Sequence, residues 1–321
     1  QDVRVVEAAV PVATDPQDVI LRVTSTAICG SDLHLYTGEL RSMPGMKKHD
    51  ILGHEFMGMV EEVGPEVKEV RKGDRVVVAF DIACGTCFYC RNSYYTSCDN
   101  TNPSKEQEMM YGHRSGGFFG YSHLTGGWDG GQAEYVRVPF ANLNCLKVPA
   151  SLSDNQVVLL SDILPTAWHS CELGEVAEGD RVAIWGAGPV GLLAAHCAFA
   201  RGAQRVILID REEERLAFAR ERIRNGTVET INFTSGGASS VGTGCPFWHP
   251  FLPLALILAS SCNPAVGLHY TSSWLHYFET ALKLETDPSE IVNELIECCR
   301  KGGRVAIAGA YAGYCNHFNI G

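Results

Sequence analysis

The feature that most constrains this chain is a run of four cysteines within fifteen residues. Cys84, Cys87, Cys90 and Cys98 follow the pattern C-x2-C-x2-C-x7-C in ACGTCFYCRNSYYTSC. Such short spacings form tight turns that direct several sulfurs to one point, as a tetrahedral structural zinc site requires. Disulfides are the alternative, but most of these pairs are too close in sequence to bridge well, and a chain of 321 residues is no small disulfide scaffold. The pattern predicts a zinc-binding lobe over residues 84–98.

Composition excludes several classes of protein. Apolar residues make up 45% of the chain and charged residues 20%, which is typical of a globular protein with room for two domains. The net charge of −11 argues against nucleic acid or an anionic membrane as a partner. The start QDVRVVEAAV lacks the apolar core of a secretory leader, and the longest apolar run, 252–259, is far shorter than the roughly 20 residues of a membrane span. The thirteen cysteines, mostly scattered, favour a reducing compartment, and we expect a cytoplasmic protein.

The first part of the chain is predicted to be β-rich. Four β-branched runs bounded by Gly, Pro or Asp are expected to be strands, at residues 19–27, 57–63, 75–80 and 133–138. Residues 100–132, which are rich in glycine, are expected to form a long loop. We assign residues 1–154 to this domain.

The second part, residues 155–321, alternates strand and helix patterns. RVAIW, an apolar helix, RVILID and the helix REEERLAFARERI follow one another, which is the βαβ pattern of a parallel sheet. A further helix is expected to start near Ser289 or Asp287 and to end before Gly302, and RVAIAGAY is expected to be another strand.

A dinucleotide-binding motif lies between the first of these strands and its helix. Glycines in the order G-x-G-x-x-G allow a tight turn, close approach of a pyrophosphate and close helix packing, and the helix N-terminus can bind the phosphates. An aspartate ends the next strand, where it can accept hydrogen bonds from ribose hydroxyls and repel a 2′-phosphate, so NAD is favoured over NADP. The arginine that follows could instead meet a 2′-phosphate, and a tight turn with a surface aspartate is the structural alternative. The predicted cofactor-binding residues are Gly186, Gly188, Pro189, Val190, Gly191, Asp210 and Arg211.

Two further motifs complete a family resemblance. TAICGSDLHLY contains C-G-S-D-x-H, and ILGHEF contains G-H-E. Together with the four-cysteine lobe and the glycine motif, in this order, they make the chain resemble the zinc-containing medium-chain alcohol dehydrogenases. The resemblance implies an α/β protein with a GroES-like β-rich catalytic domain and a Rossmann domain built on a doubly wound parallel sheet, which acts on a small alcohol or aldehyde and is a homo-oligomer if intact.

The resemblance also implies a catalytic zinc. Its ligands would be Cys29, His54 and a residue on the segment that leads into the Rossmann domain, where LLSDILPTAWHS places Asp162. Many members have cysteine there, and aspartate within SDILPT is similar to the glutathione-independent formaldehyde dehydrogenase branch. One thiolate, one imidazole and one carboxylate carry the same charge as two thiolates and an imidazole, but a carboxylate donates less electron density. We therefore hypothesise a stronger Lewis acid at the metal.

Four neighbouring residues are candidates for supporting roles. Glu55 adjoins His54 and would either be a transient extra ligand or tune the local field. Asp32 would orient a ligand ring or an arginine, or else cap a turn. Ser31 would contact the substrate oxygen, or cap the helix, or both. His34 resembles the family's outlet of a proton relay, and an imidazole pKa near 6.5 suits that task.

Two regions depart from the family pattern. Residues 236–267 contain prolines at 250 and 253, which flank the place of an expected central strand and disfavour it. The chain also stops at Gly321, before the expected return to the catalytic domain, so we expect a truncated C-terminus. The leading interpretation is a zinc- and NAD-dependent oxidoreductase for a formaldehyde-like substrate. The alternatives are a polyol or secondary-alcohol dehydrogenase, and an inactive paralogue that binds zinc and nucleotide.

Overall fold

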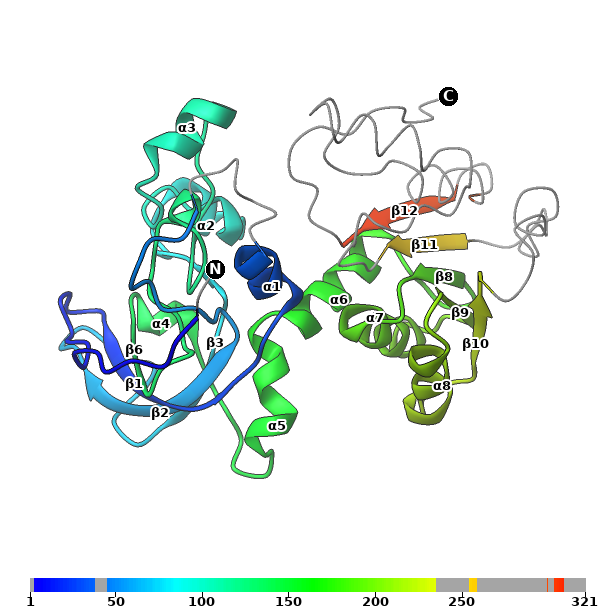
Figure 1. Ribbon diagram of the computed structural model, residues 1–321, viewed down its shortest axis with the longest axis horizontal. Coiled ribbons are helices and arrows are strands. Elements are labelled where there is room, and N and C mark those ends of the chain that lie inside the picture. The colour runs from blue at the N-terminus through cyan, green and yellow to red at the C-terminus, as the bar shows by residue number, and fades with distance from the viewer. Residues whose placement is uncertain (1–2, 38–44, 235–253, 259–298, 300–302, 309–321) are drawn as a thin grey trace. The chain divides into compact units, whose positions relative to one another are not determined.

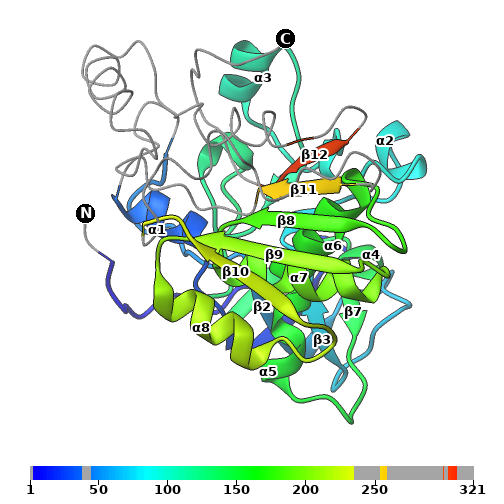
Figure 2. The ribbon, with the colours of Figure 1, turned by 90° about the vertical axis from the view of Figure 1, so that its right-hand side faces the viewer.

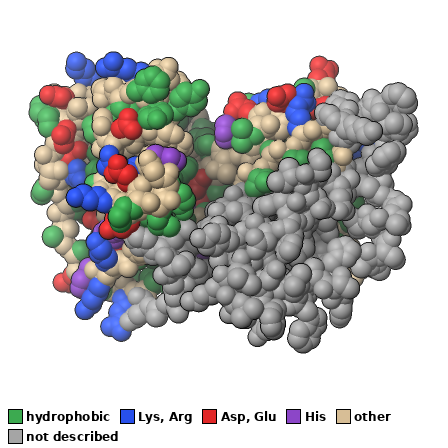
Figure 3. Space-filling view, turned by 90° about the horizontal axis from the view of Figure 1, so that it is seen from above, with side chains coloured by type: hydrophobic (Ala, Val, Ile, Leu, Met, Phe, Trp, Pro, Cys, Tyr) green, Lys and Arg blue, Asp and Glu red, His purple; other side chains and the backbone are tan. Residues whose placement is uncertain are grey.

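The computed structural model describes residues 3–37, 45–234, 254–258, 299 and 303–308 (Figure 1). The chain divides into two compact units, Gln1–Asp162 and Ile163–Gly321. Within the described ranges, no helix reaches the length and hydrophobicity needed to cross a bilayer. On the face shown in Figure 3, the basic side chains are interspersed with acidic ones.

The first unit is built on an antiparallel sheet with the strand order β6-β1-β2-β3-β7. A separate pair, β4 and β5, lies beside the cysteine lobe in sequence, and short helices fill the connections. The elements are β1 (Val19–Thr26), α1 (Gly30–Thr37), β2 (Phe56–Val63), β3 (Arg75–Val78), β4 (Asp81–Ile82), α2 (Phe88–Arg91), η1 (Tyr95–Ser97), α3 (Lys105–Tyr111), β5 (Gly117–Phe118), η2 (His123–Thr125), β6 (Tyr135–Val138), α4 (Ala141–Asn144), β7 (Cys145–Lys147), α5 (Asp154–Val157) and η3 (Val158–Ser161).

The sheet encloses a core of branched and aromatic side chains. In β3 the residues Val76 and Val78 point into it, and Phe56 of β2 packs edge-on against Phe119 with ring centroids 5.2 Å apart. Full burial of side chains of this size stabilises by roughly 1.5–3 kcal/mol each, so the sheet is a firm base for the loops at its edges.

Close backbone packing fixes the loop that precedes β2. Gly53 has φ +97°, and a Cβ there would lie 2.7 Å from the backbone nitrogen of Gln132. The backbone nitrogen of Gly131 donates to the carbonyl of Gly53 at 2.7 Å, and a Cβ on Gly120 would lie 2.5 Å from the nitrogen of Gly53. Since the backbones of three chain segments are in close contact at these glycines, His54, the next residue, is held in a rigid frame.

The second unit is a parallel sheet with the strand order β10-β9-β8-β11-β12 (Figure 2). Pairing is parallel at every step, with Val182 opposite Val206 and Ala255 opposite Val182. The helices α6, α7 and α8 share one hydrophobic core with β8 and β9. The elements are α6 (Ile163–Leu173), β8 (Arg181–Trp185), α7 (Pro189–Ala200), β9 (Arg205–Asp210), α8 (Glu213–Arg222), β10 (Val228–Asn232), β11 (Leu254–Leu258) and β12 (Arg304–Ile307).

Two local expectations from the sequence are wrong. Residues 100–132 are not one long loop, because α3 begins after Ser104, whose hydroxyl accepts the backbone N–H of Gln107, and ends at Gly112 with φ +75°. A central strand does form within 236–267, as β11 pairs with β8 and β12. Pro253 precedes this strand in sequence, where no ladder hydrogen bond is needed. The rest of that segment and the helix expected near Ser289 lie outside the described residues.

Candidate metal centres and coenzyme site

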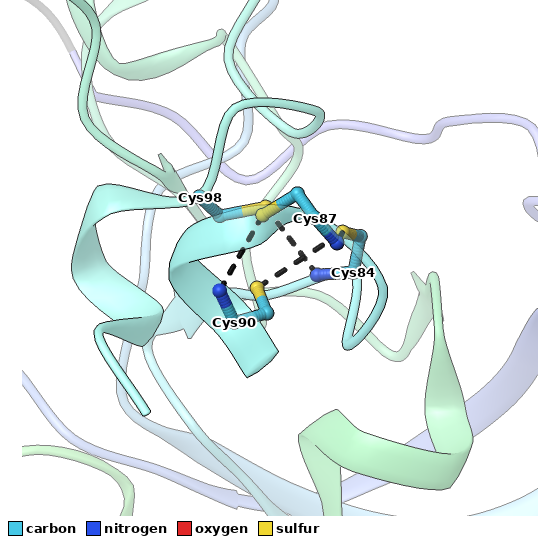
Figure 4. Close-up of side chains that lie close together, drawn as sticks. All are labelled: Cys84, Cys87, Cys90 and Cys98. Atoms are coloured by element: carbon cyan, nitrogen blue, oxygen red, sulfur yellow. Dashed lines mark hydrogen bonds between the residues drawn. The ribbon is translucent and has the colours of Figure 1, made fainter. Parts of the chain in front are cut away.

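The four cysteines of the lobe converge on one point (Figure 4). Each offers a sulfur, and the four sulfurs all lie within 4.8 Å of one another. The Sγ atoms of Cys84 and Cys90 are 4.0 Å apart, close to the roughly 3.8 Å that two Zn–S bonds of 2.3 Å subtend at a tetrahedral centre, and far beyond a disulfide bond. The nine cysteines among the described residues all have free thiols. The geometry therefore favours a metal over disulfides.

Backbone and side-chain N–H groups point at these sulfurs. Cys84 Sγ accepts the backbone N–H groups of Thr86 and Cys87, both at 3.4 Å, and the side-chain N–H of Asn100 at 3.3 Å. Burial would raise the pKa of the Cys84 thiol, but these hydrogen bonds lower it to about 6. Burial raises the pKa of Cys90 to about 12. The surroundings of Cys84 therefore favour its thiolate form. A bound cation is needed to stabilise negative charge on all four sulfurs together.

A second group of donors comes from three separate segments of the first unit. Cys29 stands directly before α1, His54 and Glu55 stand directly before β2, and Asp162 follows η3. One ligand atom from each of these four residues lies within 4.8 Å of all the others. The structure therefore brings together the thiol, imidazole and carboxylate that the family resemblance selected, over more than one hundred positions of sequence.

The imidazole of His54 sets the geometry of this cluster. Its Nε2 lies 3.3 Å from Asp162 Oδ2 and 4.0 Å from Glu55 Oε1. Zinc bonds of about 2.1 Å at the tetrahedral angle place nitrogen and oxygen ligands about 3.4 Å apart, so the first distance fits a shared ion. The other ring nitrogen, Nδ1, lies 3.5 Å from Asp32 Oδ1. Nε2 is thus directed at the shared point, and Nδ1 at a carboxylate behind it.

Asp32 connects two of the candidate ligands. Only 4% of its surface is exposed, and its Oδ2 accepts the backbone N–H of Cys29 at 2.8 Å. Its other oxygen faces the His54 ring. The two roles considered from the sequence, orienting a ligand ring and capping a turn, are compatible, because each uses a different oxygen.

The cluster is electrostatically unsatisfied as it stands. Burial alone would lower the pKa of His54, but Asp162, Asp32 and Cys29 raise it to about 12, so the ring holds a proton among acidic groups. Burial raises the pKa of Glu55, which is 2% exposed. Asp32 Oδ1, His54 Nδ1 and Glu55 Oε1 are buried atoms without a hydrogen-bond partner. A divalent cation would replace the proton and balance these charges, so the residues fit zinc.

Ser31 and His34 lie on α1 beside this cluster. Ser31 is in the first turn of the helix, and its hydroxyl oxygen lies 3.8 Å from Cys29 Sγ. His34 is half-buried one turn further along. No sequence pattern indicates Tyr121, whose ring stands edge-on to that of His54 with centroids 5.8 Å apart. A single tyrosine in a glycine-rich stretch carries no pattern that would single it out.

The glycine motif of the second unit forms a turn between β8 and α7. Gly186 has φ +100°, which favours glycine, and Gly188 caps α7 with Pro189 at its first position. Asp210 ends β9, and its Oδ2 accepts the backbone N–H of Ala187 at 2.7 Å. Val190 and Gly191 form the first turn of α7. The free N–H groups of that turn are the groups that bind phosphate in such loops.

The space beside this turn fits a nucleotide. A Cβ at Gly188 would meet no atom within 4 Å, so nothing in the protein itself requires glycine there. A shallow pocket of about 290 Å³ adjoins the turn and is lined by residues that include Gly188, Arg215 and Phe218. Arg211 is bound to Glu212, with Nε 2.8 Å from Oε1, while Arg215 lies 3.8 Å from Asp210. An open space at a glycine, beside phosphate-binding N–H groups, fits the pyrophosphate of a dinucleotide.

Comparisons with known proteins agree with this geometry. Residues 15–150 match the family model described as the alcohol dehydrogenase GroES-like domain. Over 321 residues the chain is 42% identical to the zinc-type alcohol dehydrogenase-like protein C1198.01 of Schizosaccharomyces pombe, covering 100% of this chain and 73% of that relative. The chain belongs to the zinc-type alcohol dehydrogenase family. It is therefore an oxidoreductase by family, with a GroES-like catalytic domain and a Rossmann domain.

Two more comparisons place the chain within the family. The glutathione-independent formaldehyde dehydrogenase of Pseudomonas aeruginosa is 43% identical over 222 residues, which are 66% of this chain and about half, 52%, of that enzyme. The alcohol dehydrogenase TADH from Thermus sp. ATN1 superimposes with a TM-score of 0.73 at 34% identity, covering 98% of this chain and 76% of that structure. The zinc-type dehydrogenase fold thus accounts for both units.

Proposed function

We propose that this zinc-type alcohol dehydrogenase transfers a hydride between a small, formaldehyde-like alcohol or aldehyde and NAD. The observation that supports it most is the convergence of Cys29, His54, Glu55 and Asp162 on one point within 4.8 Å. The sequence predicts a carboxylate, Asp162, in place of a second thiolate. Its Oδ2 lies 3.3 Å from His54 Nε2, a distance that fits two ligands of one zinc ion.

In this proposal each residue of the first unit has a distinct task. Cys29, His54 and Asp162 hold zinc in the catalytic site, and Cys84, Cys87, Cys90 and Cys98 hold the structural zinc. When bound, the catalytic zinc supplies a Lewis acid for the substrate oxygen and the nicotinamide supplies the hydride acceptor.

The remaining residues of the catalytic site act on protons and charge. The hydroxyl of Ser31 would take up the proton that the substrate hydroxyl loses while releasing its own proton, and His34, on the same helix, would accept the released proton and pass it to solvent. Glu55, buried and without a partner for Oε1, is available as an additional ligand or as a negative charge behind the site. Asp32 keeps the imidazole of His54 oriented from the far side.

NAD is favoured over NADP by the end of β9. Asp210 is buried and would lie against a 2′-phosphate, which its charge would repel. Arg211, the residue that could compensate, is neutralised by Glu212 at 2.8 Å. Arg215 lies 3.8 Å from Asp210, and its charge is partly balanced by that carboxylate. The local charge therefore favours a coenzyme with a free ribose hydroxyl.

A curated relative also supports the formaldehyde-like substrate class. The Pseudomonas aeruginosa relative named as a formaldehyde dehydrogenase shares 43% identity over 222 residues, which are 66% of this chain. A polyol or secondary alcohol is the alternative substrate, and a panel of formaldehyde, primary alcohols and polyols, with and without glutathione, separates the two.

The test is a comparison of zinc content and NADH formation between the wild-type protein and Asp162→Ala. We expect the wild type to hold two zinc ions per chain and to reduce NAD with formaldehyde or a short alcohol. Asp162→Ala should lose about one zinc ion and nearly all activity, because one charged ligand is gone. Asp129→Ala, which changes an exposed aspartate, serves as the control and should behave as the wild type. Full zinc content and activity in Asp162→Ala would contradict the ligand assignment.

A further inference from the structure

Asn100 donates hydrogen bonds to two of the four sulfurs of the cysteine lobe. Its side-chain Nδ2 lies 3.3 Å from Cys84 Sγ, and its backbone nitrogen lies 3.5 Å from Cys98 Sγ. The backbone nitrogen of Cys84 also donates to Cys98 Sγ, at 3.4 Å (Figure 4). These three bonds join the first and the last cysteine of the lobe, and two of the three donors belong to Asn100.

The other donors to Cys84 come from the turn that follows it. The backbone nitrogens of Thr86 and Cys87 each lie 3.4 Å from Cys84 Sγ, and the hydroxyl oxygen of Thr86 lies 3.5 Å from it. Backbone N–H groups in such a turn are supplied by almost any residue type. Asn100 differs because it reaches Cys84 from a position sixteen residues further along the chain and needs a side chain that carries an N–H group.

The backbone beside Asn100 is anchored, so its side chain starts from a fixed point. The next residue, Thr101, is buried, and its hydroxyl donates to the carbonyl of Ile82 at 2.7 Å. The same hydroxyl accepts the backbone N–H of Gly117 at 2.9 Å, and the indole N–H of Trp128 donates to the carbonyl of Thr101 at 2.8 Å. Because this backbone is already ordered, less conformational entropy is lost when the amide is held against the sulfur.

A sulfur that binds zinc gains from such a donor. Four thiolates outweigh the charge of one Zn²⁺ ion, so excess negative charge stays on the sulfurs. An N–H group directed at a thiolate stabilises that charge, and hydrogen bonds with an ionised partner are about twice as strong as neutral ones. Asn100 is exposed, so water can replace part of its contribution, and we expect an effect at the low end of those measured for residues that support metal ligands.

We propose that Asn100 is a positioning residue of the structural zinc site, whose side-chain amide holds the Cys84 thiolate and so retains the metal in the lobe. This role rests on the proposed binding of zinc by the four cysteines. It depends on the N–H group of the side chain, and not on the space that the side chain fills.

The test compares Asn100→Ala with Asn100→Asp in the zinc-loaded protein by competition with a chelator. Both variants lack the side-chain N–H, and an ionised aspartate only accepts hydrogen bonds. We expect the zinc of the lobe to be bound about tenfold more weakly in Asn100→Ala. In Asn100→Asp the loss should be about 10- to 100-fold, because repulsion between the carboxylate and the thiolate is added. A role in packing alone predicts the opposite order, since aspartate has the shape of asparagine and alanine does not.

Asn92→Asp is the matched control. Asn92 is exposed and lies in the same lobe, between the third and the fourth cysteine, but its Nδ2 donates to the carbonyl of Phe88 at 2.8 Å. The substitution makes the same change in charge and shape without removing a bond to sulfur, so this variant should bind zinc as the wild type does. The catalytic zinc, whose proposed ligands lie on other segments, is an internal reference and should keep its affinity in every variant.

Cobalt in place of zinc gives a spectroscopic readout. Co²⁺ held by thiolates absorbs light as charge moves from sulfur to the metal. Loss of an N–H donor raises the energy of the sulfur electrons, so this band should move to longer wavelength in both Asn100 variants and stay in place in Asn92→Asp. An unshifted band in both Asn100 variants would overturn the role of Asn100, as would an Asn100→Asp protein that binds zinc in the lobe as tightly as the wild type.

The outcomes also separate this inference from the proposal on which it rests. A wild-type protein that binds no zinc among the four cysteines would overturn the structural zinc site and the role of Asn100 with it. A wild type that binds zinc there, with unchanged affinity in both Asn100 variants, would overturn only the role of Asn100.

Discussion

Replacing Asp32 by asparagine should weaken the catalytic zinc site without touching any ligand. The side chain of Asp32 is buried, accepts the N–H of Cys29 at 2.8 Å, and faces His54 Nδ1 at 3.5 Å. An asparagine of the same shape keeps a carbonyl oxygen for Cys29. Its other side then presents an N–H₂ group to His54 Nδ1, or else the amide turns and loses the bond to Cys29.

The expected loss of zinc affinity in Asp32→Asn can be estimated from these contacts. With the amide facing Nδ1, the neutral imidazole prefers its proton on Nε2, the nitrogen that a metal needs. At 3.5 Å the contact between Asp32 and His54 is longer than a strong hydrogen bond, so the lower end of the range of about 1.5–3 kcal/mol for a charge-assisted bond applies. About 1.5 kcal/mol corresponds to a roughly tenfold weaker zinc affinity, at the lower edge of the 10- to 100-fold typical of such partners.

The assay is a competition titration against a chelator of known zinc affinity. The four-cysteine site provides an internal reference, because its zinc should be released at the same chelator concentration in both proteins. Asp50→Asn is the matched variant, since Asp50 pairs with His123 at 3.0 Å in another Asp–His contact of the same unit. It should leave both zinc affinities unchanged.

The reasoning would be refuted if Asp32→Asn bound zinc at the catalytic site as tightly as the wild type does. An equal loss at both zinc sites would also refute it, because that result would indicate general damage to the first unit.

Three further predictions concern other parts of the chain. Cys98→Ser should release the structural zinc and lower Tm in calorimetry by several degrees, because metal binding there stabilises the folded lobe; an unchanged Tm would contradict this. Gly188→Ala should change the Tm by no more than a few degrees, since a Cβ meets nothing within 4 Å, but weaken NAD binding in calorimetry at least tenfold by filling the pyrophosphate space; equal affinity would count against the coenzyme loop. Hydrogen bonding from Arg205 lowers the pKa of Glu229. The contribution of the Glu229–Arg205 pair to folding stability is therefore present above the unfolded pKa of about 4.3 and is lost as pH falls through the lowered pKa of folded Glu229. Because both side chains are about a third to a half exposed, Glu229→Gln should cost less than about 1 kcal/mol at neutral pH in denaturant unfolding and nothing in strong acid; a pH-independent loss would exclude the ion pair as its cause.

Local patterns were the most informative part of the sequence. Cys84 to Cys98 and Gly186 to Gly191 each lie within one short segment, so their spacing alone constrains where the side chains or backbone N–H groups point. Residues 100–132 also contain local signals for a helix. Ser104 followed by Gln107, and then Gly112, are the start and stop signals of α3. The five apolar residues of β11 can form a central strand because Pro253 precedes the strand and does not lie within it.

Long-range convergence could not be read in this way. Asp162 follows His54 by more than one hundred residues, and no spacing rule relates them; the family resemblance supplied the assignment. Tyr121 has no motif at all, because its place depends on the packing of Gly120 against Gly53. Interactions of this kind are set by the tertiary fold, so residues that orient a site are harder to predict than residues that form a compact motif.

Anomalous diffraction at the zinc absorption edge tests the central claim most directly. A crystal of the zinc-loaded protein should show two peaks per chain. One should lie among the four cysteine sulfurs, and the other about 2.0–2.3 Å from Cys29 Sγ, His54 Nε2 and a carboxylate oxygen of Asp162. A protein with the first peak but with nothing bound between Cys29, His54 and Asp162 would contradict the account.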